Sequence, residues 1–186
     1  MIGENVLNAR AIIQQFPARS QKLLQLLEER IVILDGAMGT LIQQHKLQEK
    51  DFRGSRFVGH AVDLKNNNDA LNLTQPKLIK QIHAAYLDAG VDIIETNTFN
   101  ANALAMSDFK LERVVSEINA VAVSLARDAV AVAEKKNPAR TRFIAGAIGP
   151  TSRMASLSRD INDPGRRDTT FDHFVAAYYE QASALL

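Results

Sequence analysis

Cysteine is absent from the 186-residue sequence. A chain without cysteine can form no disulfide bond, use no thiol nucleophile of its own and offer no thiolate to a metal ion. The histidines also lack the close spacing of common metal-binding motifs such as H-x-H or H-E-x-x-H; they are His45, His60, His83 and His173. The residues therefore predict no metal ligand set and no catalytic thiol within this chain.

An excess of charge of either sign is missing as well. Lysine and arginine together number 22, aspartate and glutamate 21, and the net charge is +1. This balance gives no electrostatic argument for binding nucleic acid or an anionic membrane surface. Polar residues such as Glu4 and Arg10 interrupt the N-terminal sequence. We therefore expect neither a signal peptide nor a membrane span there, and we expect a cytoplasmic protein.

The sequence does contain three short, mostly apolar runs that end at polar residues or glycine. They are IVIL at 31–34, VDII at 91–94 and FIAGAI at 143–148. Runs of this length, rich in β-branched residues, are typical of strands that are buried on both faces. We therefore predict three strands. The first follows residues 1–30, which we expect to form a helical N-terminal extension because Leu23, Leu24 and Leu27 have helical spacing.

Helical periodicity predicts a helix between successive strands and another after the last. The predicted helices cover about 74–90, 111–137 and 169–185. For the first, Thr74 is a candidate N-cap, Pro76 fits the first turn and Gly90 fits the C-terminal end. For the last, Thr169 and Asp172 have the spacing of a capping box. Each predicted helix is therefore bounded by residues that commonly begin or end one.

The order strand, helix, strand, helix, strand, helix predicts an α/β fold with parallel strands and right-handed crossovers. A doubly wound sheet and a (β/α)8 TIM barrel both have this order. The first strand end, GAMG at 36–39, lacks the G-x-G-x-x-G pattern of dinucleotide-binding sheets. A complete barrel needs roughly 250 residues. If the fold is a barrel, residues 31–186 would therefore be an incomplete barrel domain, the N-terminal portion with about three strand–helix units.

Polar residues follow each predicted strand, and the C-terminal ends of parallel strands share one edge of a sheet. Asp35 could accept a substrate ammonium group while the glycine amides after it bind a carboxylate, a combination that suits an amino acid. Asp35 could instead be a turn or capping residue, and the polar residues after the second strand could be satisfied within the fold. The candidate substrate-binding residues are Asp35, Gly36, Ala37, Met38, Gly39, Thr40, Glu95, Asn97 and Thr98.

Five motifs in order resemble one known family. They are LDGAMGT at 34–40, DFRG at 51–54, NND at 67–69, IETNTFN at 94–100 and GAIGPT at 146–151. Together they closely resemble the homocysteine-binding module of cobalamin-dependent methionine synthase, in the homocysteine S-methyltransferase family. The resemblance extends over about residues 30–186.

The resemblance implies a TIM barrel that binds homocysteine and a catalytic zinc at the C-terminal ends of its strands. Asp35 and its glycine loop would contact the amino-acid moiety. In the family, three cysteines on later strands hold the zinc, which activates the substrate thiol as a zinc-bound thiolate. That thiolate attacks the methyl group of methylcobalamin to give methionine. Zinc and cobalamin are thus the expected cofactors of the full-length enzyme, with its cobalamin- and folate-binding modules as partners.

This sequence departs from the family pattern because it has no cysteine. It supplies neither catalytic residues nor zinc ligands of the family type, so we expect the chain alone to be inactive. One alternative is a catalytically silent barrel fragment that acts as a binding or self-association domain. Another keeps the enzyme class but changes the methyl donor to betaine or S-methylmethionine, since such barrels share the glycine-rich first strand end.

Overall fold

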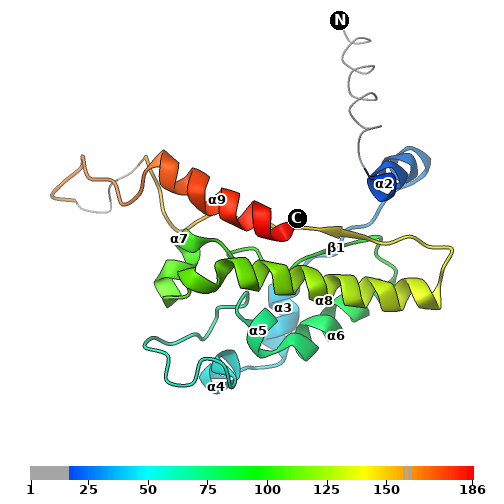
Figure 1. Ribbon diagram of the computed structural model, residues 1–186, viewed down its shortest axis with the longest axis horizontal. Coiled ribbons are helices and arrows are strands. Elements are labelled where there is room, and N and C mark those ends of the chain that lie inside the picture. Colours follow the sequence, from blue (N-terminus) through cyan, green and yellow to red (C-terminus); the bar gives the residue numbers. More distant parts are fainter. Residues whose placement is uncertain (1–16, 157, 159–160) are drawn as a thin grey trace, which may run out of the picture.

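The computed structural model describes residues 17–156, 158 and 161–186 (Figure 1). Most of the predicted N-terminal extension, residues 1–16, lies outside the described residues. The rest of it contains helix α2 (Ala18–Glu29), which buries none of its residues. No helix among the described residues has the length and apolar character needed to cross a membrane.

A small parallel sheet lies at the centre of the α/β fold. Strand β1 (Ile93–Glu95) pairs in parallel with β2 (Phe143–Ala145), with Ile93 opposite Phe143 and Glu95 opposite Ala145. Leu34 joins the other side of β1 through an isolated parallel bridge to Ile93. The predicted α/β class and parallel direction are confirmed. The described residues form only these short pairings, not a closed barrel.

The predicted first strand is the main correction to the expected sheet. Residues 31–34 form no regular strand, and only Leu34 makes a bridge. The run was also expected to be buried on both faces, but Ile31 is 86% exposed and Ile33 is 53% exposed. A continuous apolar run indicates burial only if other elements cover it. Among the described residues this segment pairs with β1 alone, and Ile31, Ile33 and Leu34 are exposed while Val32 is half-buried.

Helices α6 (Pro76–Ala89) and α8 (Val115–Lys136) pack side by side beneath the sheet in Figure 1 and carry most of the core. Ile79, Ile82 and Ile118 are among its buried side chains. Pro76 begins α6 and Gly90 ends it with a φ of 102°, as predicted. Thr74 is not the N-cap, because it is the last residue of the short helix α5 (Leu71–Thr74) and its hydroxyl donates to the carbonyl of Ala70, the N-cap of that helix.

Helix α9 (Phe171–Leu185) packs against α8 (Figure 1). Its N-cap is Thr170, whose hydroxyl accepts a hydrogen bond from the backbone N of His173 at 3.3 Å. The predicted capping box at Thr169 and Asp172 is therefore wrong by one residue. Both threonines have a suitable side chain, and Thr170 takes the role because its own backbone is the extended one that precedes the helix.

Short helices fill the loops that follow the predicted first strand and β1, where the sequence predicted no regular structure. After Leu34 come α3 (Met38–Gln44) and α4 (Glu49–Arg53), and after β1 come α7 (Ala103–Met106) and η1 (Ser107–Phe109). The 3-10 turn η2 (Glu112–Val114) instead lies at the start of the helix predicted for 111–137, ahead of α8. Buried Ile42, Phe52 and Met106 anchor these helices to the core around α6 and α8. Elements of one turn carry too few periodic positions to be detected in sequence.

A buried ion cluster joins these elements at the N-terminal ends of the strands. The side chain of Asp92 is fully buried. Its carboxylate accepts two hydrogen bonds of 2.8 Å from Arg30, one of 3.0 Å from the backbone N of Ile33 and others from Arg140. Hydrogen bonds from Arg30 hold the pKa of Asp92 well below its usual range. One carboxylate thus connects the end of α2, the first apolar run, β1 and the residues before β2.

Replacing Asp92 with asparagine should destabilise the fold by about 3 kcal/mol, because the partly exposed guanidinium groups of Arg30 and Arg140 and the buried one of Arg142 would lose their shared counter-charge. Urea unfolding at neutral pH measures this change. The matched control is Asp128→Asn, since Asp128 is 56% exposed and pairs with Lys80 at the surface; its effect should stay within about 0.5 kcal/mol. Equal effects of the two substitutions would contradict the role given to Asp92.

His83 is the second unusual group of the core. It lies on the buried face of α6 with 0% exposure, and neither of its ring nitrogens has a partner among the described residues. Burial lowers the pKa of His83 to about 4. An unfolded chain takes up this proton near pH 6.5. Folding stability contributed by neutral His83 is therefore complete above about pH 6.5 and falls as the pH decreases toward 4.

His83→Leu should raise stability at pH 5 relative to the wild type, since leucine leaves no unpaired nitrogen and takes up no proton on unfolding. The proton linkage itself amounts to at most about 3 kcal/mol, so the advantage of the variant should shrink between pH 5 and pH 7. Thermal unfolding across this range measures it. His45→Leu, at an exposed position, is the control. A pH-independent difference would refute the linkage.

Candidate functional site

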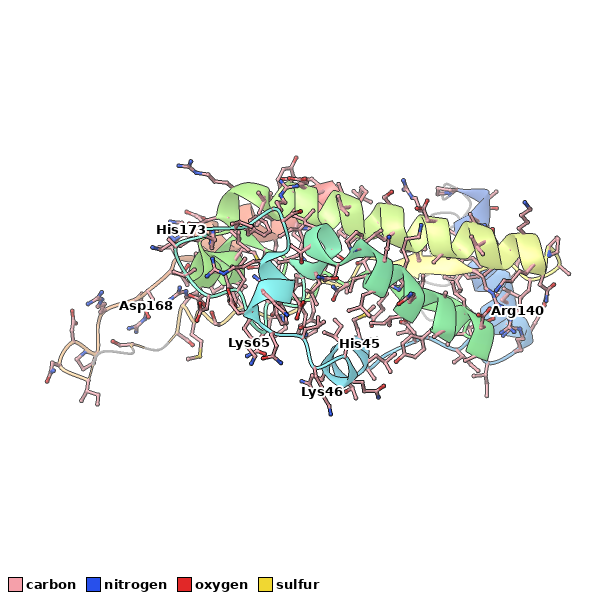
Figure 2. All side chains as sticks on the ribbon, turned by 90° about the horizontal axis from the view of Figure 1, so that it is seen from below. His45, Lys46, Lys65, Arg140, Asp168 and His173 are labelled. Carbon is pink, nitrogen blue, oxygen red and sulfur yellow. The ribbon has the colours of Figure 1, made fainter. Side chains whose placement is uncertain are left out.

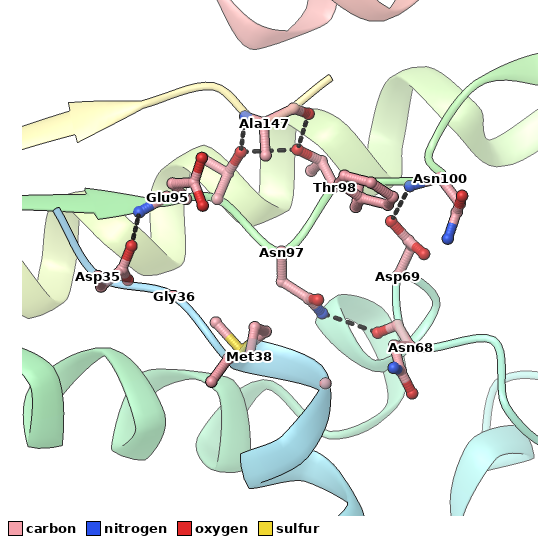
Figure 3. Close-up of a pocket in the computed structure, with 14 residues that line it drawn as sticks. Asp35, Gly36, Met38, Asn68, Asp69, Glu95, Asn97, Thr98, Asn100 and Ala147 are labelled. Atoms are coloured by element: carbon pink, nitrogen blue, oxygen red, sulfur yellow. Dashed lines mark hydrogen bonds between the residues drawn. The ribbon is translucent and has the colours of Figure 1, made fainter. Parts of the chain in front are cut away.

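A pocket of about 300 Å³ opens at the C-terminal ends of the paired segments (Figure 3). It lies where the first apolar run and β1 end and where the chain leaves β2. The predicted residues Asp35, Glu95, Asn97 and Thr98 all line it, as do residues 36–39. Thr40 does not; it lies within α3 and is exposed. The full lining is Asp35, Gly36, Ala37, Met38, Gly39, Asn68, Asp69, Glu95, Thr96, Asn97, Thr98, Phe99, Asn100 and Ala147.

Asp35 connects the first segment of the sheet to β1. Its Oδ1 accepts a hydrogen bond of 2.9 Å from the backbone N of Glu95, while its Oδ2 has no partner among the described residues. Burial raises the pKa of Asp35 to about 6; the bond from the Glu95 amide opposes this shift and the Glu95 carboxylate adds to it. Asp35 therefore has a structural role through one oxygen and keeps the other available.

The loop after Asp35 presents unused backbone donors. The N–H groups of residues 36–40 bond to no described residue. Ala37 adopts a left-handed conformation with a φ of 49° and precedes α3 as its N-cap. This sharp turn carries the chain from the sheet into α3 within the pocket lining. Free amides beside a carboxylate can bind both ends of a zwitterion.

The loop after β1 is fixed by hydroxyl groups that extend the sheet. The hydroxyls of Thr96 and Thr98 lie 2.6 Å apart, and Thr98 donates to the carbonyl of Ala147 at 2.8 Å. The backbone N of Ala147 donates to Thr96 Oγ1 at 3.0 Å. The Thr98 carbonyl in turn accepts a bond of 2.7 Å from Nε2 of Gln181 on α9. Thr98 is fully buried and its polar groups are used within the fold.

Asn97 joins this loop to the turn before α5. Its side-chain amide donates to the carbonyl of Asn68 at 2.7 Å, and its own carbonyl accepts from the side chain of Asn72, also at 2.7 Å. Only 6% of Asn97 is exposed. Many polar groups of Asn97 and Thr98 therefore bond within the fold, where they shape the pocket wall.

Asp69 is a lining residue that sequence reasoning did not select. It is buried, and its Oδ1 accepts a bond of 2.9 Å from the backbone N of Asn100. Burial raises the pKa of Asp69 to about 6. The NND run at 67–69 contributed to the resemblance, but no strand precedes it, so strand ends could not indicate it as a site. Its place in the pocket depends on contacts with distant residues.

Phe99 is a half-exposed aromatic ring at the pocket wall, also not selected from sequence. It lies against Gly149, where an added Cβ would approach the ring to 2.8 Å. The backbone N of Gly149 also donates to the Phe99 carbonyl at 2.9 Å. Glycine at 149 is therefore required by this close approach, and it allows Phe99 to lie against the chain that leaves β2.

The charge of the pocket is entirely acidic. Asp35, Asp69 and Glu95 line it, and no lysine, arginine or histidine does. Among the described residues, no group of three histidine, cysteine, aspartate or glutamate side chains comes together to hold a metal ion. The part of the chain that the structure describes thus offers no donor set that fits the zinc that the resemblance implies. The pocket fits a ligand that carries a positive charge and hydrogen-bond acceptors.

The chain matches the family model for homocysteine S-methyltransferase over residues 32–186. Among solved structures, the metallated form of the homocysteine methyltransferase MmuM from Escherichia coli aligns with a TM-score of 0.63 at 23% identity, over 87% of this chain and 52% of that chain. The oxidized form of the same protein aligns with a TM-score of 0.62 at 22% identity, over 86% of this chain and 51% of that one.

The likeness to these structures shows the fold alone, since the identities are low. The chain spans about half the length of the solved structures that it matches. The family model, in contrast, covers all of the sheet, the pocket and the helices around them. The chain therefore belongs to the homocysteine S-methyltransferase family.

Proposed function

We propose that this chain is the N-terminal part of a methionine synthase homocysteine S-methyltransferase module and that its pocket binds homocysteine. Residues 31–186 would be the incomplete barrel domain and residues 1–30 its extension. The observation that carries the proposal is the acidic pocket at the strand ends, with three carboxylates and no basic side chain in its lining. A pocket with this charge favours a ligand that carries a positive group. Homocysteine supplies that group as its ammonium, and its thiol side chain is uncharged.

In this proposal, the free Oδ2 of Asp35 accepts a hydrogen bond from the substrate ammonium group. The amides of residues 36–40 donate to the substrate carboxylate. Glu95 adds negative charge near the ammonium group, and its backbone N holds Asp35 in place. Asn97 and Thr98 keep the wall of the pocket in position through their bonds to neighbouring segments. This chain thereby orients the amino-acid end of homocysteine.

Activation of the substrate thiol is not assigned to any residue of this chain, because its described residues do not fit a zinc site. We propose methylcobalamin as the donor in the full-length enzyme, held by a separate cobalamin-binding module beside a folate-binding one. The DFRG and NND segments support this choice over betaine or S-methylmethionine through the family resemblance. The isolated chain would then bind substrate without transferring a methyl group.

Asp35→Asn tests the proposed site directly. Asparagine keeps an oxygen for the amide of Glu95 but loses the charge, so homocysteine should bind about tenfold more weakly. Calorimetric titration of the folded chain with L-homocysteine measures the affinity. In the wild type, affinity should also fall as the pH decreases through about 6, where Asp35 and Asp69 are protonated, and the variant should keep only the part of this pH dependence that comes from Asp69.

The control for this titration is Asp128→Asn, an exposed position on α8 outside the pocket. It should leave the affinity unchanged at every pH. If Asp35→Asn binds homocysteine as tightly as the wild type, Asp35 is not part of the substrate site.

Self-association is a second candidate function, favoured by the uncovered first apolar run. Ile31 is 86%, Ile33 53% and Leu34 48% exposed beside a sheet segment that pairs on one side only. An exposed apolar sheet edge is a common surface for pairing with another chain. In this alternative the chain would be a catalytically silent domain whose copies cover one another.

Sedimentation velocity at increasing protein concentration tests this alternative. If copies cover the apolar run, the wild type should form dimers or larger species, and Ile33→Lys should shift the protein to monomer. Val58→Lys is the control, because Val58 is 78% exposed but lies in a loop far from the sheet edge in sequence. A wild-type chain that stays monomeric at every concentration contradicts self-association.

A further inference from the structure

A second cleft lies at the opposite end of the strands from the acidic pocket. Its volume is about 440 Å³, and it forms between α2 and the residues that lead into β2. Arg140, one of its residues, lies at the far end of the molecule from His173 in Figure 2. The lining is Lys22, Leu26, Arg30, Ala139, Arg140 and Thr141. It contains three basic side chains and no acidic one.

Several hydrogen-bond donors of this cleft are unused. Arg30 bonds through Nη1 and Nη2, and Arg140 through Nε and Nη2. Arg30 Nε and Arg140 Nη1 therefore donate to none of the described residues. The ammonium group of Lys22 and the hydroxyl of Thr141 also have no partner there. The cleft thus combines positive charge with free donors, which is the arrangement that an oxyanion requires.

The neighbouring acids do not neutralise this charge. Asp92 is buried and already accepts from Arg30, Arg140 and a backbone amide, and Arg142 Nη1 lies 4.0 Å from it. One carboxylate therefore faces three guanidinium groups. Glu134 is occupied by Arg19 and by the backbone N of Arg142. Glu29 acts on Arg30 only through its charge and does not line the cleft.

Stabilisation of Asp92 explains only part of this arrangement. It accounts for Arg30 and Arg140, whose hydrogen bonds reach the buried carboxylate. It does not account for Lys22 or Thr141, which make no bond to Asp92 yet line the same cleft. These two residues allow the cleft to be altered without breaking the ion cluster.

We propose that this cleft is a binding site for a small molecule carrying a phosphate or carboxylate group. Lys22, Arg30 and Arg140 bind the anion by charge, Thr141 adds a neutral donor, and Leu26 and Ala139 provide an apolar wall for the rest of the ligand. The volume is in the range of small-molecule sites. The site is separate from the acidic pocket, because the two clefts share no residue.

Calorimetric titrations with inorganic phosphate and with succinate, at constant ionic strength, test the proposal on the folded chain. The wild type should bind at least one of these anions at millimolar concentration. Lys22→Gln should weaken binding about tenfold, because it removes a charged hydrogen bond. Thr141→Val should weaken it severalfold without changing the charge. Lys77→Gln, at an exposed lysine on α6, should bind like the wild type.

The two anions separate the sources of the ligand group. Binding of phosphate alone identifies a site selective for phosphate groups, and binding of succinate as well identifies a site that also accepts carboxylates. Absence of binding by either anion overturns the proposal. Equal weakening by Lys22→Gln and Lys77→Gln also overturns it, because the attraction would then arise from the overall charge. Neither result depends on whether homocysteine binds, which is measured separately.

Discussion

The parallel pairing of Leu34, β1 and β2 is the constraint on which the rest of the structure depends. Because the three segments run in the same direction, all of their C-terminal ends meet at one side and all of their beginnings meet at the other. The acidic pocket forms at the first side and the basic cleft at the second. Asp92 holds the beginnings together, so the register that positions Asp35 beside Glu95 depends on a carboxylate at the opposite end.

The acidic pocket reduces the stability of the fold at neutral pH. Burial raises the pKa values of Asp35 and Asp69 to about 6. Near pH 6 the folded chain therefore still holds protons that the unfolded chain has already released. Above about pH 6 both groups are charged in surroundings that disfavour charge, and stability is lower than below it. A cationic ligand offsets this loss. Such carboxylates are commonly found where a protein binds or transforms a substrate.

Sequence reasoning predicted what local patterns determine. Apolar runs predicted β1 and β2, helical periodicity predicted α6, α8 and α9, and strand direction predicted that Asp35 and Glu95 would meet. It failed where distant contacts decide. The burial of residues 31–34 depends on covering elements, and Asp69 reaches the pocket only through the fold of the loop after α4. The choice between Thr169 and Thr170 as N-cap depends on backbone conformation.

Helix α9 supports the pocket wall through the hydrogen bond from Gln181 to the carbonyl of Thr98, although no residue of α9 lines the pocket. The same loop is held on its other side by Asn68 and Asn72. Detachment of α9 would break the bond to Thr98 and make the pocket wall more mobile. A ligand that orders the wall would in turn favour the docked position of α9. If the pocket binds its proposed ligand, ligand occupancy and the docking of the last helix are therefore reciprocal equilibria, linked through the buried amide of Gln181 and the bond from Tyr178 to the carbonyl of Gly149.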